Sequence, residues 1–311
     1  MAGVPRATLA PVTKTLLLHI GVHKTGTTAI QYLLAHVEPF GDRVLYPRSG
    51  RSKVRDRNSH KELASAIRKQ PGCDEGCWDR LRRELGENPA EIAVLSAEAF
   101  SSLQDHEVER LRRELRDSDV RVLVYLRNPL GFMARSYAQA VKSSGYPAPF
   151  GDFIRFDDRI ARCNYAALMD RWVGVWGCDR VRLQIYDKVA ASLLEDFMAQ
   201  VPVPHAPIGE LRRRNPTPPV HLLHLLRYVN RLEGLGARVG VPPEVFSRIR
   251  RSLREKRGLG GPVRAWHKRV ARGSRIYSPR DVEYLRGAVG GWMEDFLARY
   301  VDAEDRHYFA F

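Results

Sequence analysis

Apolar runs of strand length alternate with segments of helical periodicity over the first two thirds of the chain, and this alternation constrains the fold most. The strand-length runs are Thr15–Ile20, Arg43–Tyr46, Glu91–Ser96, Val120–Leu126 and Arg180–Tyr186. The helical segments are Thr27–Ala35, Lys61–Arg68, Trp78–Leu85, His106–Leu115, Pro129–Lys142 and Tyr165–Val175. Strands joined by crossover helices pair in parallel. The sequence therefore predicts an α/β fold, with a central parallel sheet flanked by helices.

The strand signals stop after Val201, where a proline-rich stretch leads into helical patterns. The expected helices lie near Val220–Leu232, Pro243–Arg257 and Arg280–Tyr300. We expect a flexible tail over residues 1–13, an α/β core over 14–201, and a basic helical extension over 202–311. The extension is expected to pack on the core, so that the chain forms one domain.

The positive charge of the chain is concentrated in one stretch. The net charge is +15, and residues 205–280 carry +14 of it, with 18 Lys and Arg against four acidic residues. Such a stretch favours an anionic substrate or an anionic membrane surface as its partner. A nucleic-acid partner is disfavoured, because the basic segment Ser247–Arg254 has neither an aromatic platform for RNA nor an evident DNA-reading motif.

Composition and cysteine spacing predict a cytoplasmic protein, at most peripheral to a membrane. An apolar content of 44% excludes disorder as the dominant state. No apolar run reaches the about 18 residues of a membrane span, and Leu16–Ile20 leads into a glycine loop rather than a cleavage site. The four cysteines, Cys73, Cys77, Cys163 and Cys178, show neither a CxxC pair nor a metal spacing. We therefore expect thiols and no metal site.

The first strand runs directly into the glycine loop Gly21–Thr28, which opens a helix. In a parallel sheet this turn lies at the carboxyl edge of the strands, where ligands bind. Backbone N–H groups, hydroxyls and Lys24 together form a cradle for an anion. A nucleoside-triphosphate loop carries lysine directly after its second glycine, whereas Lys24 precedes Gly26 by two residues. The alternative is a plain helix cap with a solvated Lys24.

A second basic position follows the strand Val120–Leu126, which ends in Arg127-Asn128-Pro129. A magnesium site in the usual NTPase arrangement requires an acid at such a place, and a cation there repels the metal. Two positive sites at strand ends suit a nucleotide with phosphates at both its 5′ and 3′ ends.

These motifs resemble the sulfotransferases that use 3′-phosphoadenosine 5′-phosphosulfate, particularly the soluble bacterial members. In that family a Lys-[Thr/Ser]-Gly-Thr-[Thr/Ser] loop grips the 5′-phosphosulfate, and a strand-end arginine holds the 3′-phosphate. The loop is matched by Lys24, Thr25, Gly26, Thr27 and Thr28, the arginine by Arg127, and the resemblance spans roughly Leu16 to Gln200.

The resemblance implies a P-loop type of nucleotide-binding fold and transfer of a sulfuryl group to a hydroxyl acceptor. The acceptor would be a glycan, a glycolipid or a small metabolite, the product 3′,5′-bisphosphoadenosine, and no metal would be required. The family serine that contacts the 3′-phosphate stands eight residues after the arginine, which is Arg135 here, while Ser136 follows at nine. We favour Ser136 and keep Arg135 as a contact, since a guanidinium matches phosphate well. By the same resemblance Tyr186 approaches the adenine, and packing is its alternative role.

In the expected mechanism Lys24 stabilises the charge on the leaving phosphate, and another residue removes a proton from the acceptor. Glu98 follows the strand that ends at Ser96 and is the first candidate for this base. His60 is the second, and His23, which adjoins Lys24 and would touch the sulfuryl group, is the third. A helix-capping role for Glu98 and a solvated loop position for His60 remain alternatives.

Two other functions remain open from the sequence. A magnesium-dependent P-loop kinase keeps the phosphate cradle but needs a metal-binding acid that the motifs do not supply. A nucleic-acid or membrane-binding module uses the basic stretch and keeps the α/β part as a scaffold. The segment Lys256–Gly261 echoes a basic loop that closes over the 3′-phosphate in animal members of the family, and a solvated basic loop is favoured there.

Overall fold

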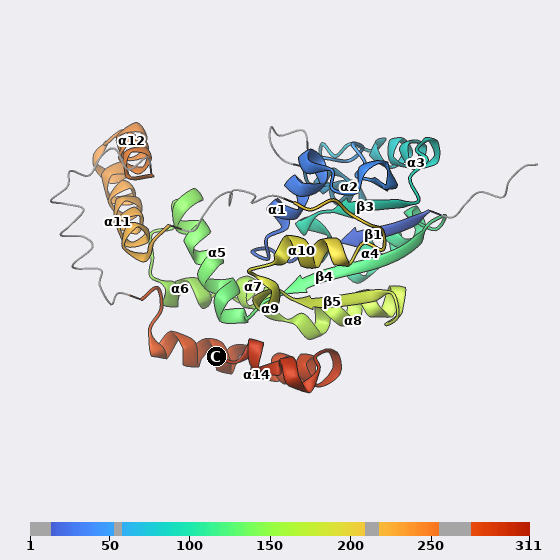
Figure 1. Ribbon diagram of the computed structural model, residues 1–311. Coiled ribbons are helices and arrows are strands. Elements are labelled where there is room, and N and C mark those ends of the chain that lie inside the picture. The colour runs from blue at the N-terminus through green and yellow to red at the C-terminus, as the bar shows by residue number, and fades with distance from the viewer. Residues whose placement is uncertain (1–13, 53–57, 209–217, 255–274) are drawn as a thin grey trace, which may run out of the picture. The chain divides into compact units, whose positions relative to one another are not determined.

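The structure is a computed structural model that describes residues 14–52, 58–208, 218–254 and 275–311 (Figure 1). The predicted tail over 1–13 and the segment Lys256–Gly261 lie outside the described residues. The chain divides into two compact units. The first unit comprises Met1–Leu126 and Leu168–Arg212, and the second comprises Arg127–Ala167 and Arg213–Phe311.

The first unit is built on a five-stranded, all-parallel sheet (Figure 1). Its strands are β1 (Thr15–His19), β2 (Val44–Leu45), β3 (Ile92–Ser96), β4 (Asp119–Leu126) and β5 (Val181–Ile185). Their order is β2-β3-β1-β4-β5, so β1 is central. The predicted α/β fold is thereby confirmed: a central parallel sheet flanked by helices.

Strand β1 is buried on both faces, which explains why its apolar residues run continuously rather than alternating. Leu16 and Leu18 point to one face and Leu17 to the other, and none is more than 6% exposed. Leu17 packs in a core with Ile30 and Phe197, which belong to α1 (Thr27–Tyr32) and α10 (Leu193–Ala199). Helices α1 and α10 therefore cover the same face of the sheet.

Three more helices of the first unit are joined to one another by arginines. They are α2 (Lys61–Ile67), α4 (Asp105–Glu114) and α8 (Tyr165–Trp176), and α3 (Cys77–Glu87) contacts α2. Arg110 of α4 donates to the Ile67 carbonyl at 2.6 Å, and Arg112 donates to the Val175 carbonyl at 2.7 Å. These contacts fix α4 between its two neighbours.

The expected helix over Thr27–Ala35 differs from the observed one in its second half. After α1 the chain continues as a π-helix, Leu33–Val37, which ends at Glu38 with a φ of 50°. The sequence did not predict several short elements of the first unit. These are the two 3₁₀ turns Gly41–Arg43 and Glu98–Ser102, the helix α9 (Tyr186–Val189) and the helix α10. They are too short for a helical period to stand out in the sequence.

All regular elements in the described residues of the second unit are helices. Its elements are α5 (Pro129–Ser143), α6 (Phe150–Ile154), α7 (Asp157–Ile160), the 3₁₀ turn Ala161–Cys163, α11 (Val220–Gly236), the 3₁₀ turn Ala237–Val239, α12 (Pro243–Arg254), α14 (Pro279–Tyr300) and the 3₁₀ turn Ala303–Phe309. Aromatic rings fill its interior: Tyr165, Phe296 and Phe309 form one cluster. No helix in the described part of the chain is both long enough and apolar enough to span a membrane.

Candidate functional site

The loop after β1 adopts a conformation that suits an anion. Lys24 has a φ of 73° and Gly26 a φ of 77°, so two left-handed residues bend the loop before α1 begins. The side chain of Thr25 is buried and donates to the Val22 carbonyl at 2.6 Å, which braces the loop from within. Gly26 is the N-cap of α1 and contributes no capping side chain. The first turn of α1 is thus left for an external acceptor.

A buried hydroxyl under this loop has no hydrogen-bond partner among the described residues. Thr27 is 1% exposed, and its Oγ1 makes no hydrogen bond. A Cβ placed on Gly21 would lie 2.6 Å from this Oγ1 and 2.8 Å from Nε2 of His19, which is also buried without a hydrogen-bond partner. Buried polar atoms normally have partners, so both atoms fit a loop built for a polar ligand.

The loop after β1 meets the loop after β3 through a histidine and a carboxylate. His23 Nδ1 lies 2.7 Å from Glu98 Oε2, and the side chains are 43% and 33% exposed. The strand register explains the meeting: His19 and Ser96 are paired residues of β1 and β3, and His23 and Glu98 follow them by four and two positions. Because a carboxylate only accepts hydrogen bonds, it places a proton on His23 Nδ1 and leaves Nε2 as a proton acceptor.

His60 occupies a different environment from His23. It is fully buried, its Nδ1 accepts from the Ser96 N–H at 3.1 Å, and its Nε2 lies 2.9 Å from the Pro47 carbonyl. Both ring nitrogens are therefore used within the protein. The sequence analysis offered His60 as the second candidate base, or as a solvated loop histidine. This geometry gives it a structural role instead, tying the start of α2 to the end of β3.

Ser96 links the two buried histidines. Its Oγ lies 2.9 Å from Nδ1 of His19, and its backbone N–H bonds His60. Gln31 of α1 donates to the Ser96 Oγ at 3.2 Å. Burial lowers the pKa of His19 to about 4, against a weaker opposing effect of Glu98, and the pKa of His60 to about 3, with Arg51 adding to the shift. Both imidazoles are therefore neutral at pH 7.

Tyr186, which is predicted to approach the adenine, lies beside the glycine loop. A Cβ on Gly26 would overlap the side chain of Leu193 and would lie 3.6 Å from Cε2 of Tyr186. Glycine is favoured at this position by its φ and by the close approach of Leu193, whereas Tyr186 lies at ordinary contact distance. Leu193 was missed in the sequence because nothing along the chain signals the short helix α10.

Arg127 follows β4 and belongs to the second unit. It is 7% exposed, and its guanidinium lies against Gly131, where a Cβ would approach Nη2 to 2.9 Å. Tyr165 donates to the Arg127 carbonyl at 2.9 Å. Asn128 caps α5 by accepting from the Leu130 N–H at 2.9 Å. The Arg-Asn-Pro sequence thus combines a cation, a cap and a proline in the first turn of the helix.

Arg135 and Ser136 occupy different faces of α5. Arg135 stands four residues after Gly131, which places it about 40° around the helix, whereas Ser136 is turned by about 140°. Arg135 therefore shares the face against which the Arg127 guanidinium lies. This geometry favours Arg135 over Ser136, the residue preferred from the sequence, as the side chain that acts beside Arg127.

The remaining candidates of the glycine loop lie on either side of the N-cap Gly26. Lys24 is half-buried and Thr28 is exposed at the start of α1. Within the described residues, no group of three or more His, Cys, Asp or Glu side chains is arranged to hold a metal ion. Sequence reasoning missed His19, Gln31 and Ser96. A polar residue at the end of an otherwise apolar strand was the available signal for His19 and Ser96.

Comparisons with known proteins give little beyond this geometry. No protein-family model matches the sequence, and no curated protein sequence matches it. Among solved structures, the chain is similar to a sulfotransferase from Alicyclobacillus acidocaldarius, with 18% identity, 72% of this chain and 91% of that chain covered, and a TM-score of 0.45.

Proposed function

We propose that this protein transfers a sulfuryl group from 3′-phosphoadenosine 5′-phosphosulfate to a hydroxyl acceptor. The observation that carries the proposal is the pairing of His23 with Glu98 beside the Lys24 loop. A proton acceptor next to an anion cradle is what transfer of a charged group to a hydroxyl requires.

In this proposal His23 is the general base, and Glu98 orients it. The acceptor oxygen loses its proton to Nε2 of His23 and forms a bond to sulfur, while the bond from sulfur to the 5′-phosphate oxygen breaks. The 3′,5′-bisphosphoadenosine product leaves with the bonding electrons. Glu98 stabilises the imidazolium that forms, because its carboxylate faces the other ring nitrogen.

The glycine loop is proposed to hold the 5′-phosphosulfate of the donor. Lys24 supplies a positive charge where the leaving phosphate gains negative charge. The buried Thr27 hydroxyl, which has no hydrogen-bond partner among the described residues, would donate to a donor oxygen. Tyr186 lies next to Gly26 and is proposed to pack against the adenosine.

For the 3′-phosphate, the proposed residues are Arg127 and Arg135, with Ser136 as the alternative. This assignment is supported by the sequence motif and, within the second unit, by the shared face of α5. The acceptor is proposed from the positive charge of residues 205–280: it would be a glycan, glycolipid or small metabolite that carries a negative charge.

Binding and transfer measured together test the proposal. Calorimetry with 3′,5′-bisphosphoadenosine in a buffer that contains a chelator should show binding by the wild type. We expect binding to weaken about tenfold or more in Lys24→Ala, since a charge-assisted contact is lost. Transfer is followed with radiolabelled donor and a cell extract, and mass spectrometry identifies the labelled acceptor. An absolute requirement for magnesium would instead support a kinase.

A further inference from the structure

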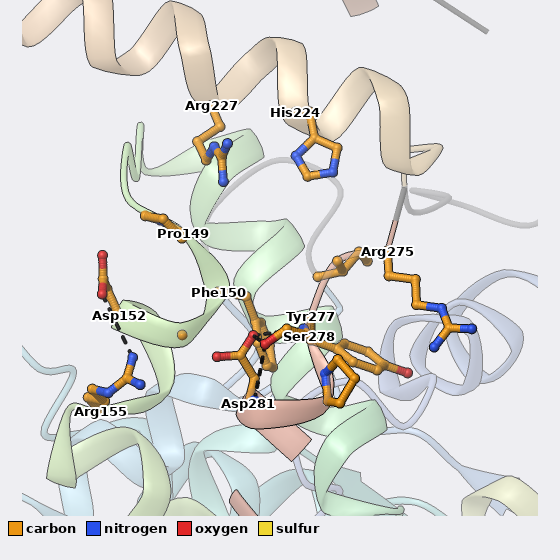
Figure 2. A pocket seen from close by; sticks show the side chains of 13 residues that line it. Pro149, Phe150, Asp152, Arg155, His224, Arg227, Arg275, Tyr277, Ser278 and Asp281 are labelled. Carbon is orange, nitrogen blue, oxygen red and sulfur yellow. Dashed lines mark hydrogen bonds and ion pairs between the residues drawn. The ribbon is translucent and has the colours of Figure 1, made fainter. Parts of the chain in front are cut away.

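The second unit contains an open pocket of about 570 Å³ (Figure 2). It is lined by the segment around α6, by one face of α11 and by the residues that lead into α14. Its volume lies within the about 300–1,000 Å³ range of small-ligand pockets. None of the residues placed in the donor-binding or proton-accepting roles lines it.

Positive side chains predominate in this pocket. Arg155, Arg227 and Arg275 line it together with His224, against two carboxylates, Asp152 and Asp281. Asp281 is occupied as a helix cap, because its Oδ2 accepts from the Ser278 N–H and hydroxyl, both at 2.8 Å. Asp152 lies 3.8 Å from Arg155. The pocket therefore retains more positive than negative charge for a ligand.

Two of the arginines are held in place by aromatic rings. The Arg155 guanidinium lies 5.1 Å from the centre of the Tyr284 ring, and that of Arg227 lies 5.3 Å from the centre of the Tyr228 ring. Such contacts restrict a long side chain before the ligand arrives, so less entropy is lost on binding. Figure 2 shows Arg227 and His224 projecting from α11 toward α6 and the start of α14.

The pocket also has an apolar part. Phe150 is buried, and the centre of its ring lies 5.6 Å from that of the half-buried Tyr277. Because Phe150 is buried, the ring that a ligand can meet is that of Tyr277, which Phe150 supports. A ligand that meets this ring and the arginines must combine an apolar ring face with an oxyanion. We propose that this pocket binds an acidic sugar, with each carboxylate or sulfate group on one of Arg155, Arg227 and Arg275, which lie on different sides of the pocket (Figure 2). The role of this pocket as the acceptor site rests on the proposed function. The binding of an acidic sugar to it does not.

Calorimetry with three disaccharides tests this site: an unsulfated uronic-acid disaccharide, its sulfated counterpart and neutral lactose. We expect the wild type to bind the acidic sugars and not lactose, and Arg275→Gln to weaken binding about fivefold or more. Arg286→Gln, an exposed arginine of α14 outside the lining, is the matched control.

Equal binding of lactose, no binding of either acidic sugar, or an unchanged affinity in Arg275→Gln would overturn the site. Titration of the same samples with 3′,5′-bisphosphoadenosine separates the two proposals. Sugar binding without nucleotide binding would refute the proposed nucleotide donor and would support the pocket as a sugar-binding site. Nucleotide binding without sugar binding refutes the pocket alone.

A separate observation concerns the outer face of α11. Among the large apolar side chains of the described residues that are exposed, a group lies on α11, the turn after it and α12. On α11 and its turn they are Tyr228, Leu232, Leu235 and Val239, between 51% and 79% exposed. They recur at helical spacing and so form one stripe.

This stripe lies opposite the face of α11 that packs in the unit. Leu223, Leu226 and Asn230 are buried, and Leu232 stands nine residues after Leu223, which is about 180° around the helix. Asn230 donates to the carbonyls of Val141 and Tyr146 at 2.9 and 3.2 Å. Helix α11 therefore has two apolar faces, one in the core and one exposed.

Arginines lie along one edge of the exposed stripe, and α12 is fixed to α11. Arg231 and Arg238 are exposed and lie about 70–90° from the centre of the stripe. Arg250 of α12 forms an ion pair with Glu233, with Nη2 at 3.1 Å from Oε1. Exposed Val245 and Ile249 of α12 add to the apolar surface. We propose that this surface binds an anionic lipid bilayer, its apolar residues entering the headgroup boundary and its arginines meeting lipid phosphates.

Vesicle sedimentation tests the bilayer proposal. We expect the full chain to sediment with phosphatidylserine-containing vesicles, to be released at high salt, and to bind pure phosphatidylcholine much more weakly. The double variant Leu232→Ser with Leu235→Ser should lose most of the binding, whereas Phe156→Ser, an equally exposed residue outside the stripe, should not.

Unchanged binding in the double variant would overturn the bilayer proposal, as would equal binding to neutral vesicles. Sedimentation velocity without lipid gives a second readout. A wild-type dimer that the double variant converts to a monomer would show that the stripe is an interface between copies, and would also overturn the proposal.

Discussion

His23 Nδ1 and Glu98 Oε2 lie 2.7 Å apart, although the two residues come from different loops. The parallel register of β1 and β3 brings the loop ends together, because both strands end at the same edge of the sheet. A half-exposed imidazole, oriented by a carboxylate and adjacent to Lys24, is available to a substrate in a way that the buried His60 is not.

Replacing Glu98 should separate catalysis from binding. We expect Glu98→Gln to lower kcat by about 10²-fold or more, because the amide does not stabilise the imidazolium of His23. The affinity for 3′,5′-bisphosphoadenosine should stay within about twofold, since Glu98 is not proposed to touch the nucleotide. Glu87→Gln, at an exposed carboxylate of α3, is the control. Equal loss of kcat in both variants would refute the role of Glu98.

Removing the Thr27 hydroxyl should affect ligand binding more than folding. Thr27→Val keeps the shape of the side chain and removes a buried hydroxyl that has no hydrogen-bond partner among the described residues. We expect no loss of stability and about a tenfold loss of bisphosphoadenosine affinity. Thr25→Val should instead lower the free energy of unfolding by about 1 kcal/mol or more, because Thr25 donates a hydrogen bond to the Val22 carbonyl. Chemical denaturation and calorimetry measure the two effects; unchanged nucleotide affinity in Thr27→Val would contradict the assignment.

Gly26→Ala should lower the stability of the protein by more than backbone strain alone would. Gly26 and Gly72 have φ angles of 77° and 71°, but a Cβ at Gly26 meets Leu193, while one at Gly72 has open space. We expect Gly72→Ala to cost about 1 kcal/mol of stability, through strain in the left-handed region. Gly26→Ala should cost more and also weaken nucleotide binding. Equal melting temperatures for the two variants would show that the Leu193 contact is unimportant.

The two buried histidines should make the protein less stable in acid. Their pKa values in the folded state, about 4 for His19 and about 3 for His60, lie below the ordinary value of 6.5. The unfolded chain therefore binds protons first as the pH falls, so the stability is complete above pH 6.5 and is lost between 6.5 and about 3. In His60→Gln the slope of the unfolding free energy against pH should become shallower. A wild-type stability that stays flat over this range would contradict the prediction.

The 3′-phosphate contact can be isolated by comparing two nucleotides. We expect Arg127→Gln and Arg135→Gln each to weaken binding of 3′,5′-bisphosphoadenosine by about tenfold, and to leave binding of adenosine 5′-monophosphate nearly unchanged. Ser136→Ala should affect neither, since Ser136 faces away from Gly131. A selective effect of Ser136→Ala, with none from Arg135→Gln, would restore the serine as the contact.

Local patterns predicted the parallel sheet well, because its strands are short apolar runs bounded by clear helix starts. The glycine loop could likewise be recognised from one motif and its resemblance, while the roles of Lys24, Gly26 and Tyr186 stay predictions. The environment of His60 could not be predicted, because its burial depends on Pro47 and Ser96, which come from other loops.

The His23–Glu98 contact was similarly hidden in the sequence, where 75 positions separate the two residues. Only the register of β1 against β3 shows that they meet. The grouping of residues 127–167 with the C-terminal helices also depends on packing between distant segments, for which local periodicity gives no signal.

The most direct test of the account is a transfer assay with radiolabelled 3′-phosphoadenosine 5′-phosphosulfate and a cell extract, in the presence of a chelator. The account predicts that the wild type transfers label to an acceptor, and that His23→Gln reduces the transfer rate about 10²-fold or more while still binding 3′,5′-bisphosphoadenosine. Absence of both transfer and nucleotide binding in the wild type, or full transfer by His23→Gln, would contradict it.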